Sequence, residues 1–301
     1  MNADVRALPG PVSFEVVDPG PSTTVQDAGR PGWAHLGVTR SGFLDRASAR
    51  WANRLVGNDP DAALLETTAG GVTLTAVRDV VVAVTGARCE VFVAGRPAPL
   101  DEAVVVRADT LLHVGRALQG LRSYVALGGG IDAPPVLGSR STDLLGGIGP
   151  SPLAAGDRLR VGREQPAAGA RTHGLVPRDV MGATPLPHVH TLRVLPGPRI
   201  DWLDDVRVLD AVEFVAGSGS NRVGLRLEQP SVPWARRPGE LPSEPMVLGA
   251  VQLPPSGDPV VFLADHPTTG GYPVVAVVVE EDLDLCARIR PGERVRFRTA
   301  G

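Results

Sequence analysis

Residues 72–127 read VTLTAVRDVVVAVTGARCEVFVAGRPAPLDEAVVVRADTLLHVGRALQGLRSYVAL. This segment consists of short runs rich in β-branched residues, each bounded by glycine, proline or aspartate, a pattern typical of consecutive short strands. The predicted strands are Val72–Ala76, Val80–Val84, Glu90–Val93, Val104–Arg107, Leu111–Val114 and Arg122–Leu127. Barrels and sandwiches are both built from strands of this kind, so the segment predicts an all-β fold.

The same pattern continues on both sides of this segment. Further strands are predicted at Val12–Val17, Thr191–Leu195, Val206–Leu209, Val212–Val215, Val260–Ala264, Val274–Val279 and Val295–Arg298. Between them, residues 164–190 lose periodicity and are rich in proline, glycine and alanine, which is typical of a linker. We therefore predict two domains, 1–165 and 191–301, joined by a linker at 166–190.

The two predicted domains end alike, with AGDRLRV at 155–161 and PGERVRF at 291–297. In each, a turn glycine and an acid precede alternating apolar and arginine residues, the pattern of a half-buried strand. The match indicates a duplicated barrel, although two unrelated strand ends can share so common a pattern.

Two minor helices are predicted within the first domain. Asp45 is an N-cap candidate before a helical apolar stripe, and Gly57 follows where a C-terminal glycine belongs. A second short helix is predicted over 58–66, because Pro60 suits the first helical position and an acid follows it.

The composition excludes several classes of function. All 30 basic residues are arginine, so the chain has no lysine for a Walker A loop, a Schiff base or covalently attached biotin. The formal net charge of −3 gives no reason to expect nucleic acid as a partner. The absence of lysine itself is adequately explained by an arginine-rich codon usage.

Cysteine and histidine usage predicts neither a disulfide framework nor a metal site. Cys89 and Cys286 lie far apart in the sequence, and His188 with His190 lacks a third ligand nearby. No membrane-spanning run or export signal is found, so we expect a soluble, cytoplasmic protein without a membrane partner.

Three polar, glycine-rich loops are the candidate ligand sites: 22–32, 218–224 and 265–273. Hydroxyls, amides and backbone N–H groups in such loops can bind a carboxylate or phosphate, yet the same residues also make ordinary turns. If ATP is bound here, arginines would contact phosphate and carboxylates would hold magnesium; the candidates are Arg30, Arg140 and Arg222 with Asp27, Asp265 and Glu244.

At these loops the sequence resembles the biotin-dependent carboxyltransferase-like family, also called the allophanate hydrolase subunit 2 family. The resemblance covers about residues 16–297. Its motifs here are TTVQDAGRPG (23–32), HLGV (35–38), ANRLVGN (52–58), LET (65–67), GG (70–71), GGID (129–132), LGSRST (137–142), SNRVGLRL (220–227), GAVQ (249–252) and TTGGYP (268–273).

The resemblance implies two cyclophilin-like β-barrel domains and a role within an ATP-dependent 5-oxoprolinase complex, which converts 5-oxoproline to glutamate. It implies two partners: an allophanate hydrolase subunit 1-like protein, similar to the B subunit of 5-oxoprolinase, and a protein similar to the A subunit of 5-oxoprolinase. ATP with magnesium is the expected cofactor, bound by this chain or by the complex.

The candidate site residues follow from the same loops. We assign catalytic roles to Asp27, Arg30, Arg222 and Asp265. Substrate or nucleotide binding is assigned to Thr23, Thr24, Gln26, Arg140, Ser220, Asn221, Glu244, Thr268, Thr269, Gly270, Gly271 and Tyr272.

Two other functions stay open. The chain could bind and sequester its subunit 1-like partner, as family members implicated in control of a histidine kinase are thought to do. Alternatively, it could transfer a carboxyl group from biotin carried on another chain, since this chain has no lysine to carry it.

Overall fold

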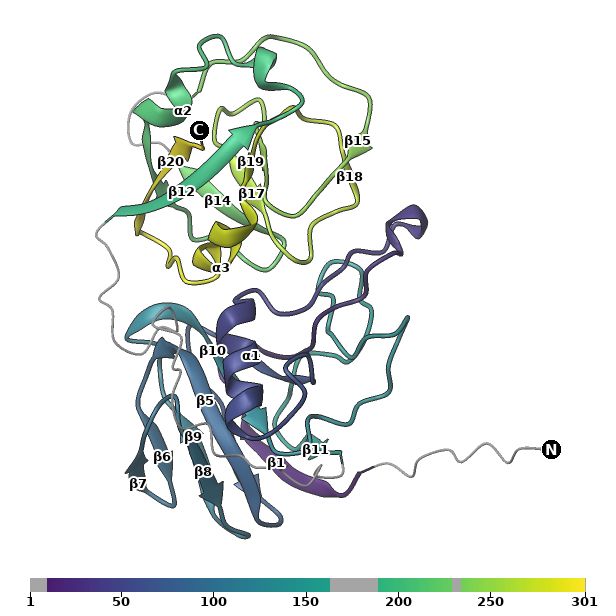
Figure 1. Ribbon diagram of the computed structural model, residues 1–301, viewed down its shortest axis with the longest axis vertical. Helices are drawn as coiled ribbons and strands as arrows, with labels where there is room; N and C mark the ends of the chain where they lie inside the picture. The colour runs from purple at the N-terminus through teal and green to yellow at the C-terminus, as the bar shows by residue number, and fades with distance from the viewer. Residues whose placement is uncertain (1–9, 163–188, 229–233, 301) are drawn as a thin grey trace, which may run out of the picture.

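The computed structural model describes residues 10–162, 189–228 and 234–300. Figure 1 shows two units one above the other, and among the described residues every sheet draws its strands from one unit alone. We call residues 10–162 the N-terminal half and 189–300 the C-terminal half. The predicted linker lies outside the described residues except for its last two, which begin a strand.

The N-terminal half contains two antiparallel sheets. The first has the order β11-β1-β4-β9-β6-β7, formed by Arg158–Arg160, Val12–Asp18, Thr73–Ala76, Leu111–Val114, Val91–Val93 and Arg96–Ala98. The second has the order β2-β3-β10-β5-β8, formed by Thr23–Gln26, Leu64–Thr68, Gln119–Leu127, Val80–Arg88 and Ala103–Val106. One apolar core, to which both sheets contribute, holds them together.

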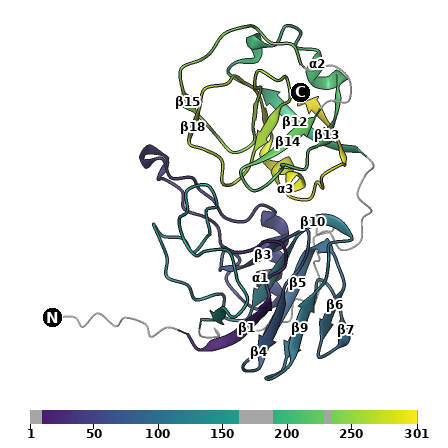
Figure 2. The ribbon, with the colours of Figure 1, turned by 180° about the vertical axis from the view of Figure 1, so that it is seen from behind.

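Helix α1 (Arg46–Leu55) covers the outer face of the second sheet, beside β5 and β10, as Figure 2 shows from behind. Along β10, Val125 and Leu127 face the core between the sheets, whereas Tyr124 and Ala126 pack in the cluster under α1. Both faces of β10 are thus buried, which explains its near-continuous apolar sequence.

The C-terminal half is a closed seven-stranded barrel. Its order is β12-β19-β16-β17-β14-β13-β20, formed by Val189–Pro196, Val274–Val278, Ala250–Gln252, Val260–Phe262, Gly224–Glu228, Glu213–Ala216 and Arg294–Thr299. All pairs are antiparallel except β12 with β20, which run parallel and close the ring. Outside the barrel, β15 (Glu244–Pro245) pairs with β18 (Thr269–Gly270).

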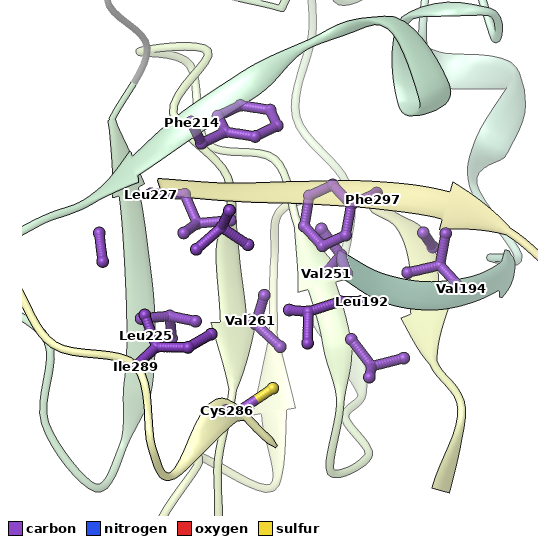
Figure 3. Close-up of a cluster of buried hydrophobic side chains, with 14 of the residues drawn as sticks. Leu192, Val194, Phe214, Leu225, Leu227, Val251, Val261, Cys286, Ile289 and Phe297 are labelled. Carbon is purple, nitrogen blue, oxygen red and sulfur yellow. The ribbon is translucent and has the colours of Figure 1, made fainter. Parts of the chain in front are cut away.

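The interior of the barrel is packed with apolar side chains (Figure 3). Phe214 and Phe297 meet edge-on with ring centroids 5.6 Å apart, and Trp234 lies 5.0 Å from Phe214. Edge-to-face aromatic pairs of this kind add to the stabilisation that burial alone provides. The prediction of an all-β fold with minor helices is confirmed.

The remaining helices are short: η1 (Ala34–Leu36), η2 (Ile200–Trp202), α2 (Val208–Ala211), η3 (Glu280–Asp282) and α3 (Leu283–Cys286). Within the described ranges, none of the helices has the length and apolar content needed to cross a bilayer.

Two local predictions were wrong. Instead of a helix over 58–66, a single turn is followed by β3, because Leu64 and Leu65 are fully buried and the strand pairs with both β2 and β10. The segment predicted as a strand at 206–209 is a turn that leads into α2, whose Leu209 packs into the barrel core. In both places tertiary packing overrode local preference.

The two similar segment ends are both strands, as predicted, but they pair differently. β11 pairs antiparallel with β1, whereas β20 pairs parallel with β12. The equivalence between the two halves therefore does not extend to the pairing of these final strands.

Candidate functional site

Arg222 and Asp265 lie side by side at the boundary between the two halves. The Nε of Arg222 donates to Asp265 Oδ2 at 2.9 Å, and its Nη2 donates to Asp265 Oδ1 at 3.1 Å. From the N-terminal half, Glu66 accepts from Nη1, and the carbonyl of Gly42 accepts from Nη2 at 2.7 Å. We call Glu66, Arg222 and Asp265 the buried clamp, since all three side chains are enclosed.

The remaining capacity of Asp265 is also used across the boundary. Ser41 Oγ donates to its Oδ1 at 2.6 Å, and the backbone N–H of Leu144 donates to its Oδ2 at 3.1 Å. Burial opposes the charge of Arg222, but Glu66 and Asp265 raise its pKa above the ordinary value. The clamp is therefore a fully engaged ionic network that joins the halves.

Asp27 also has its carboxylate occupied. It accepts from Ser139 Oγ at 2.5 Å, from Ser141 Oγ at 2.6 Å, from Arg140 N at 2.6 Å and from Gly29 N at 2.8 Å. A carboxylate with four donors fixes the loop around 139–141 against the loop that contains Asp27. Its contacts make it an anchor of these two loops.

Arg30 is almost completely buried without a carboxylate at ion-pair distance among the described residues. Its Nε donates to Val136 O at 3.4 Å and its Nη2 to Ser141 O, while Nη1 has no partner in the described structure. Burial lowers the pKa of this guanidinium, and the nearby carboxylates of Asp143, Asp27 and Asp265 partly offset that effect.

Three further arginines, which sequence reasoning missed, surround a small cavity beside the clamp. The cavity of about 10 Å³ is lined by Ala28, Arg40, Ser41, Phe43, Arg46 and Arg50, and we call it the arginine pocket. Its volume admits about one water-sized group. Arg46 pairs with Glu280 at 3.0 Å and Arg50 with Asp61 at 2.8 Å, whereas the guanidinium of Arg40 makes no hydrogen bond or ion pair to any described residue.

The electrostatics of the arginine pocket favour an anion. Burial, followed by the neighbouring charges of Arg46 and Arg50, lowers the pKa of Arg40. An oxygen of a carboxylate or phosphate in the cavity would relieve this repulsion. Arg46 and Arg50 are four residues apart on the predicted helix, so their shared face could have been found from spacing; the approach of Arg40 could not.

The other predicted binding residues lie in two different settings. Thr23, Thr24 and Gln26 are buried in β2, where Thr23 Oγ1 donates to Pro19 O at 2.7 Å and Gln26 Nε2 donates to Thr24 Oγ1 at 3.0 Å. Arg140 lies in the loop that Asp27 anchors, with its guanidinium 3.9 Å from Asp132. These residues are neighbours of the boundary region.

The loop residues of the C-terminal half lie in turns of the barrel. Asn221 Oδ1 accepts from Val223 N at 2.8 Å, and Ser220 Oγ accepts from Arg226 N at 3.0 Å, which is the hairpin-turn alternative for this loop. No hydrogen bond or ion pair between described residues links them to Asp27 or Arg30.

The segment with Thr268, Thr269, Gly270, Gly271 and Tyr272 runs along β18 beside β15. There Glu244 Oε2 accepts from Arg199 Nε at 3.1 Å, and this hydrogen bond lowers the pKa of Glu244. Of the three predicted loops, the structure thus brings 22–32 together with Arg222 and Asp265, and contacts of the described residues do not join 268–272 to them.

Magnesium does not fit the carboxylates assigned to it from sequence. Asp27 and Asp265 have their oxygens occupied, Glu244 is paired with Arg199, and the described part of the chain contains no group of three or more metal-binding side chains. The catalytic assignments themselves stay predictions.

Comparison with known proteins defines the class. The model of the carboxyltransferase domain, subdomains A and B, matches residues 36–299, and the chain belongs to this family. The resemblance inferred from the motifs is therefore confirmed.

The chain is 36% identical to the C subunit of 5-oxoprolinase from Escherichia coli, over 94% of its own length and 90% of the relative. It is 32% identical to urea amidolyase of Lachancea kluyveri, over 95% of this chain but only 17% of that protein. The crystal structure of Kluyveromyces lactis urea carboxylase superposes with a TM-score of 0.85 and 30% identity, covering 97% of this chain and 28% of that one.

Proposed function

We propose that this chain is one component of an ATP-dependent 5-oxoprolinase that opens 5-oxoproline to glutamate. The observation that carries the proposal is the 36% identity to the C subunit of 5-oxoprolinase over nearly the full length of both chains. In this proposal the chain acts in a complex with an allophanate hydrolase subunit 1-like partner and a protein similar to the A subunit of 5-oxoprolinase.

The arginine pocket gives this chain a part in substrate binding. The substrate 5-oxoproline carries a carboxylate, and the unpaired guanidinium of Arg40 offers it a charge-assisted hydrogen bond. Ser41 lines the same pocket and is held by Asp265, so the clamp positions one wall of the pocket. Positioning and charge complementarity are the contributions that such a site makes to opening an amide.

We assign ATP and magnesium to the complex rather than to this chain. The assignment rests on the occupied carboxylates at Asp27, Asp265 and Glu244, which leave no donor set for magnesium in the described residues.

The test is the ATP-dependent loss of 5-oxoproline in the reconstituted complex, measured with and without this chain. We expect activity only when the chain is present, and equal rates would refute the proposal. The variant Arg40→Gln should raise KM for 5-oxoproline about tenfold, the effect of losing a hydrogen bond to a charged group. The control Arg54→Gln, on the exposed side of α1, should leave KM unchanged.

A second candidate is carboxyl transfer from biotin carried on another chain. The observation that favours it is the similarity to urea carboxylase over 97% of this chain. It requires a separate biotinylated carrier, because this chain has no lysine. A streptavidin blot of the purified complex would detect such a carrier, and its absence would count against this candidate.

A further inference from the structure

A second, larger cavity lies in the N-terminal half between the outer strands of the two sheets. β7 ends the first sheet, β8 ends the second, and residues 99–102 connect them. The cavity of about 340 Å³ is lined by Arg88, Cys89, Glu90, Val91, Phe92, Pro97, Ala98, Leu100 and Asp101. In Figure 1 these strands lie at the lower end of the N-terminal half, away from the C-terminal half.

One carboxylate oxygen in this cavity has no partner. Asp101 Oδ1 is buried, and neither a hydrogen bond nor an ion pair to any described residue engages it. Burial raises the pKa of the Asp101 carboxyl. A buried acceptor without a donor is costly to a fold, and its position in a cavity wall marks a place for an external donor.

The backbone at Asp101 is in the left-handed region with φ of 60°, and its N–H donates to Val84 O at 2.9 Å. The hydrogen bond to β5 holds the residue in this sparsely populated conformation beside the cavity. A turn alone does not demand this burial: Asp109 has φ of 58° in the turn between β8 and β9, yet it is exposed and lines no described cavity.

The rest of the wall is apolar. Val91, Phe92, Pro97 and Leu100 surround the cavity, and Cys89 lines it with a mostly buried thiol. Cavities of this size that combine apolar walls with a few directed polar groups are typical small-molecule sites.

We propose that this cavity binds a small molecule with an apolar body and a cationic nitrogen head, whose N–H donates to Asp101 Oδ1. The apolar body packs against Phe92, Pro97 and Leu100, and the head supplies the donor that the protein lacks there. The proposal is independent of the 5-oxoprolinase function, since the cavity shares no residue with the arginine pocket.

Benzamidine is the test ligand, because it joins a flat apolar ring to a cationic N–H donor; benzyl alcohol, similar in size but neutral, is its comparison. In calorimetric titrations of the full chain we expect benzamidine to bind and benzyl alcohol to bind more weakly. Asp101→Asn should raise the Kd for benzamidine about tenfold or more, as expected for a lost hydrogen bond to a charged group. The matched control Asp109→Asn should leave it unchanged.

A second measurement needs no variant. The chain has two cysteines, so alkylation by iodoacetamide can be followed separately at Cys89 and at Cys286, whose thiol is buried and has its pKa raised to about 12. Benzamidine should slow alkylation of Cys89 and leave Cys286 unaffected. The proposal is overturned if benzamidine fails to bind the wild-type chain, if Asp101→Asn binds it equally well, or if Cys89 is not protected.

Discussion

At the scale of single residues, the boundary between the halves depends on Arg222. Its guanidinium reaches Glu66 and Asp265 at once and also meets a backbone carbonyl. Each of these contacts is made without water, in a buried setting where an unmatched charge is expensive. Removing one member leaves the other charges of the clamp without compensation.

Arg222→Ala should therefore lower the free energy of unfolding by about 3–5 kcal/mol, the range for breaking a buried ion pair. Arg222→Lys should also destabilise the protein, because an ammonium cannot reproduce the forked contacts. Urea denaturation followed by tryptophan fluorescence measures the change.

The control is Arg207→Ala, which removes an exposed pair with Asp205 and should give no measurable change. A destabilisation of equal size in both variants would contradict the account of the clamp.

Sequence alone brought the predicted residues only part of the way to a site. Arg222 and Asp265 were identified as partners of the 22–32 loop, and the structure does place them at the same boundary. Their engagement with Glu66 and Ser41 could not be seen, because contacts between residues 156 positions apart leave no periodic signal in the sequence. For the same reason the free guanidinium of Arg40 was missed.

At the scale of elements, β20 closes the barrel between β12 and β13. Glu293, just before β20, accepts from His190 Nε2 on β12 and from Arg290 N, each at 2.9 Å. Burial opposes ionisation of this carboxyl, but these two hydrogen bonds hold its pKa below the ordinary value for glutamate. The contact thus ties the start of one closing strand to the start of the other.

A group whose pKa is lowered on folding contributes stability above its unfolded pKa and loses that contribution as the pH falls through its folded pKa. The stability advantage of the wild type over Glu293→Gln should therefore be present near pH 6 and should vanish in acid, below the ordinary pKa of glutamate, about 4.3. Urea denaturation at a series of pH values measures this difference. An advantage that persists unchanged below the folded pKa would contradict the assignment.

Elements were predictable where local pattern and tertiary setting agreed. The helix after Asp45 begins as predicted, with Asp45 Oδ1 accepting from Ser48 N at 3.0 Å, because the cap and the apolar stripe are local features. β3 was not predictable, since its proline, acid and apolar run also suit a helix, and only pairing with β2 and β10 selects the strand.

At the scale of the whole molecule, the two halves are joined by more than the clamp. The first two N–H groups of α1, on Arg46 and Ala47, donate to the carboxylate of Asp284, at 3.0 and 3.1 Å. Arg288 Nε donates to Asp45 Oδ2 at 2.8 Å. A helix of one half is thus capped in part by residues of the other half.

We therefore expect the halves to unfold as one cooperative unit. Trp33 and Trp51 report on the N-terminal half, and Trp202 and Trp234 on the C-terminal half, so variants that keep one pair of tryptophans follow each half separately. Their urea transitions should coincide in the otherwise wild-type chain and separate when Asp284→Ala and Arg288→Ala are combined. Separate transitions in the parent chain would refute the coupling.

The parallel pairing of β12 with β20 also has a consequence during synthesis on the ribosome. Every strand of the N-terminal half, up to β11 at Arg160, is translated before β12 begins at Val189. The barrel, in contrast, leaves the backbone of β12 unpaired on one side until β20, about a hundred residues later, has emerged. The nascent chain would thus carry an exposed strand edge for most of the translation of its second half, which makes this half the natural client of a chaperone.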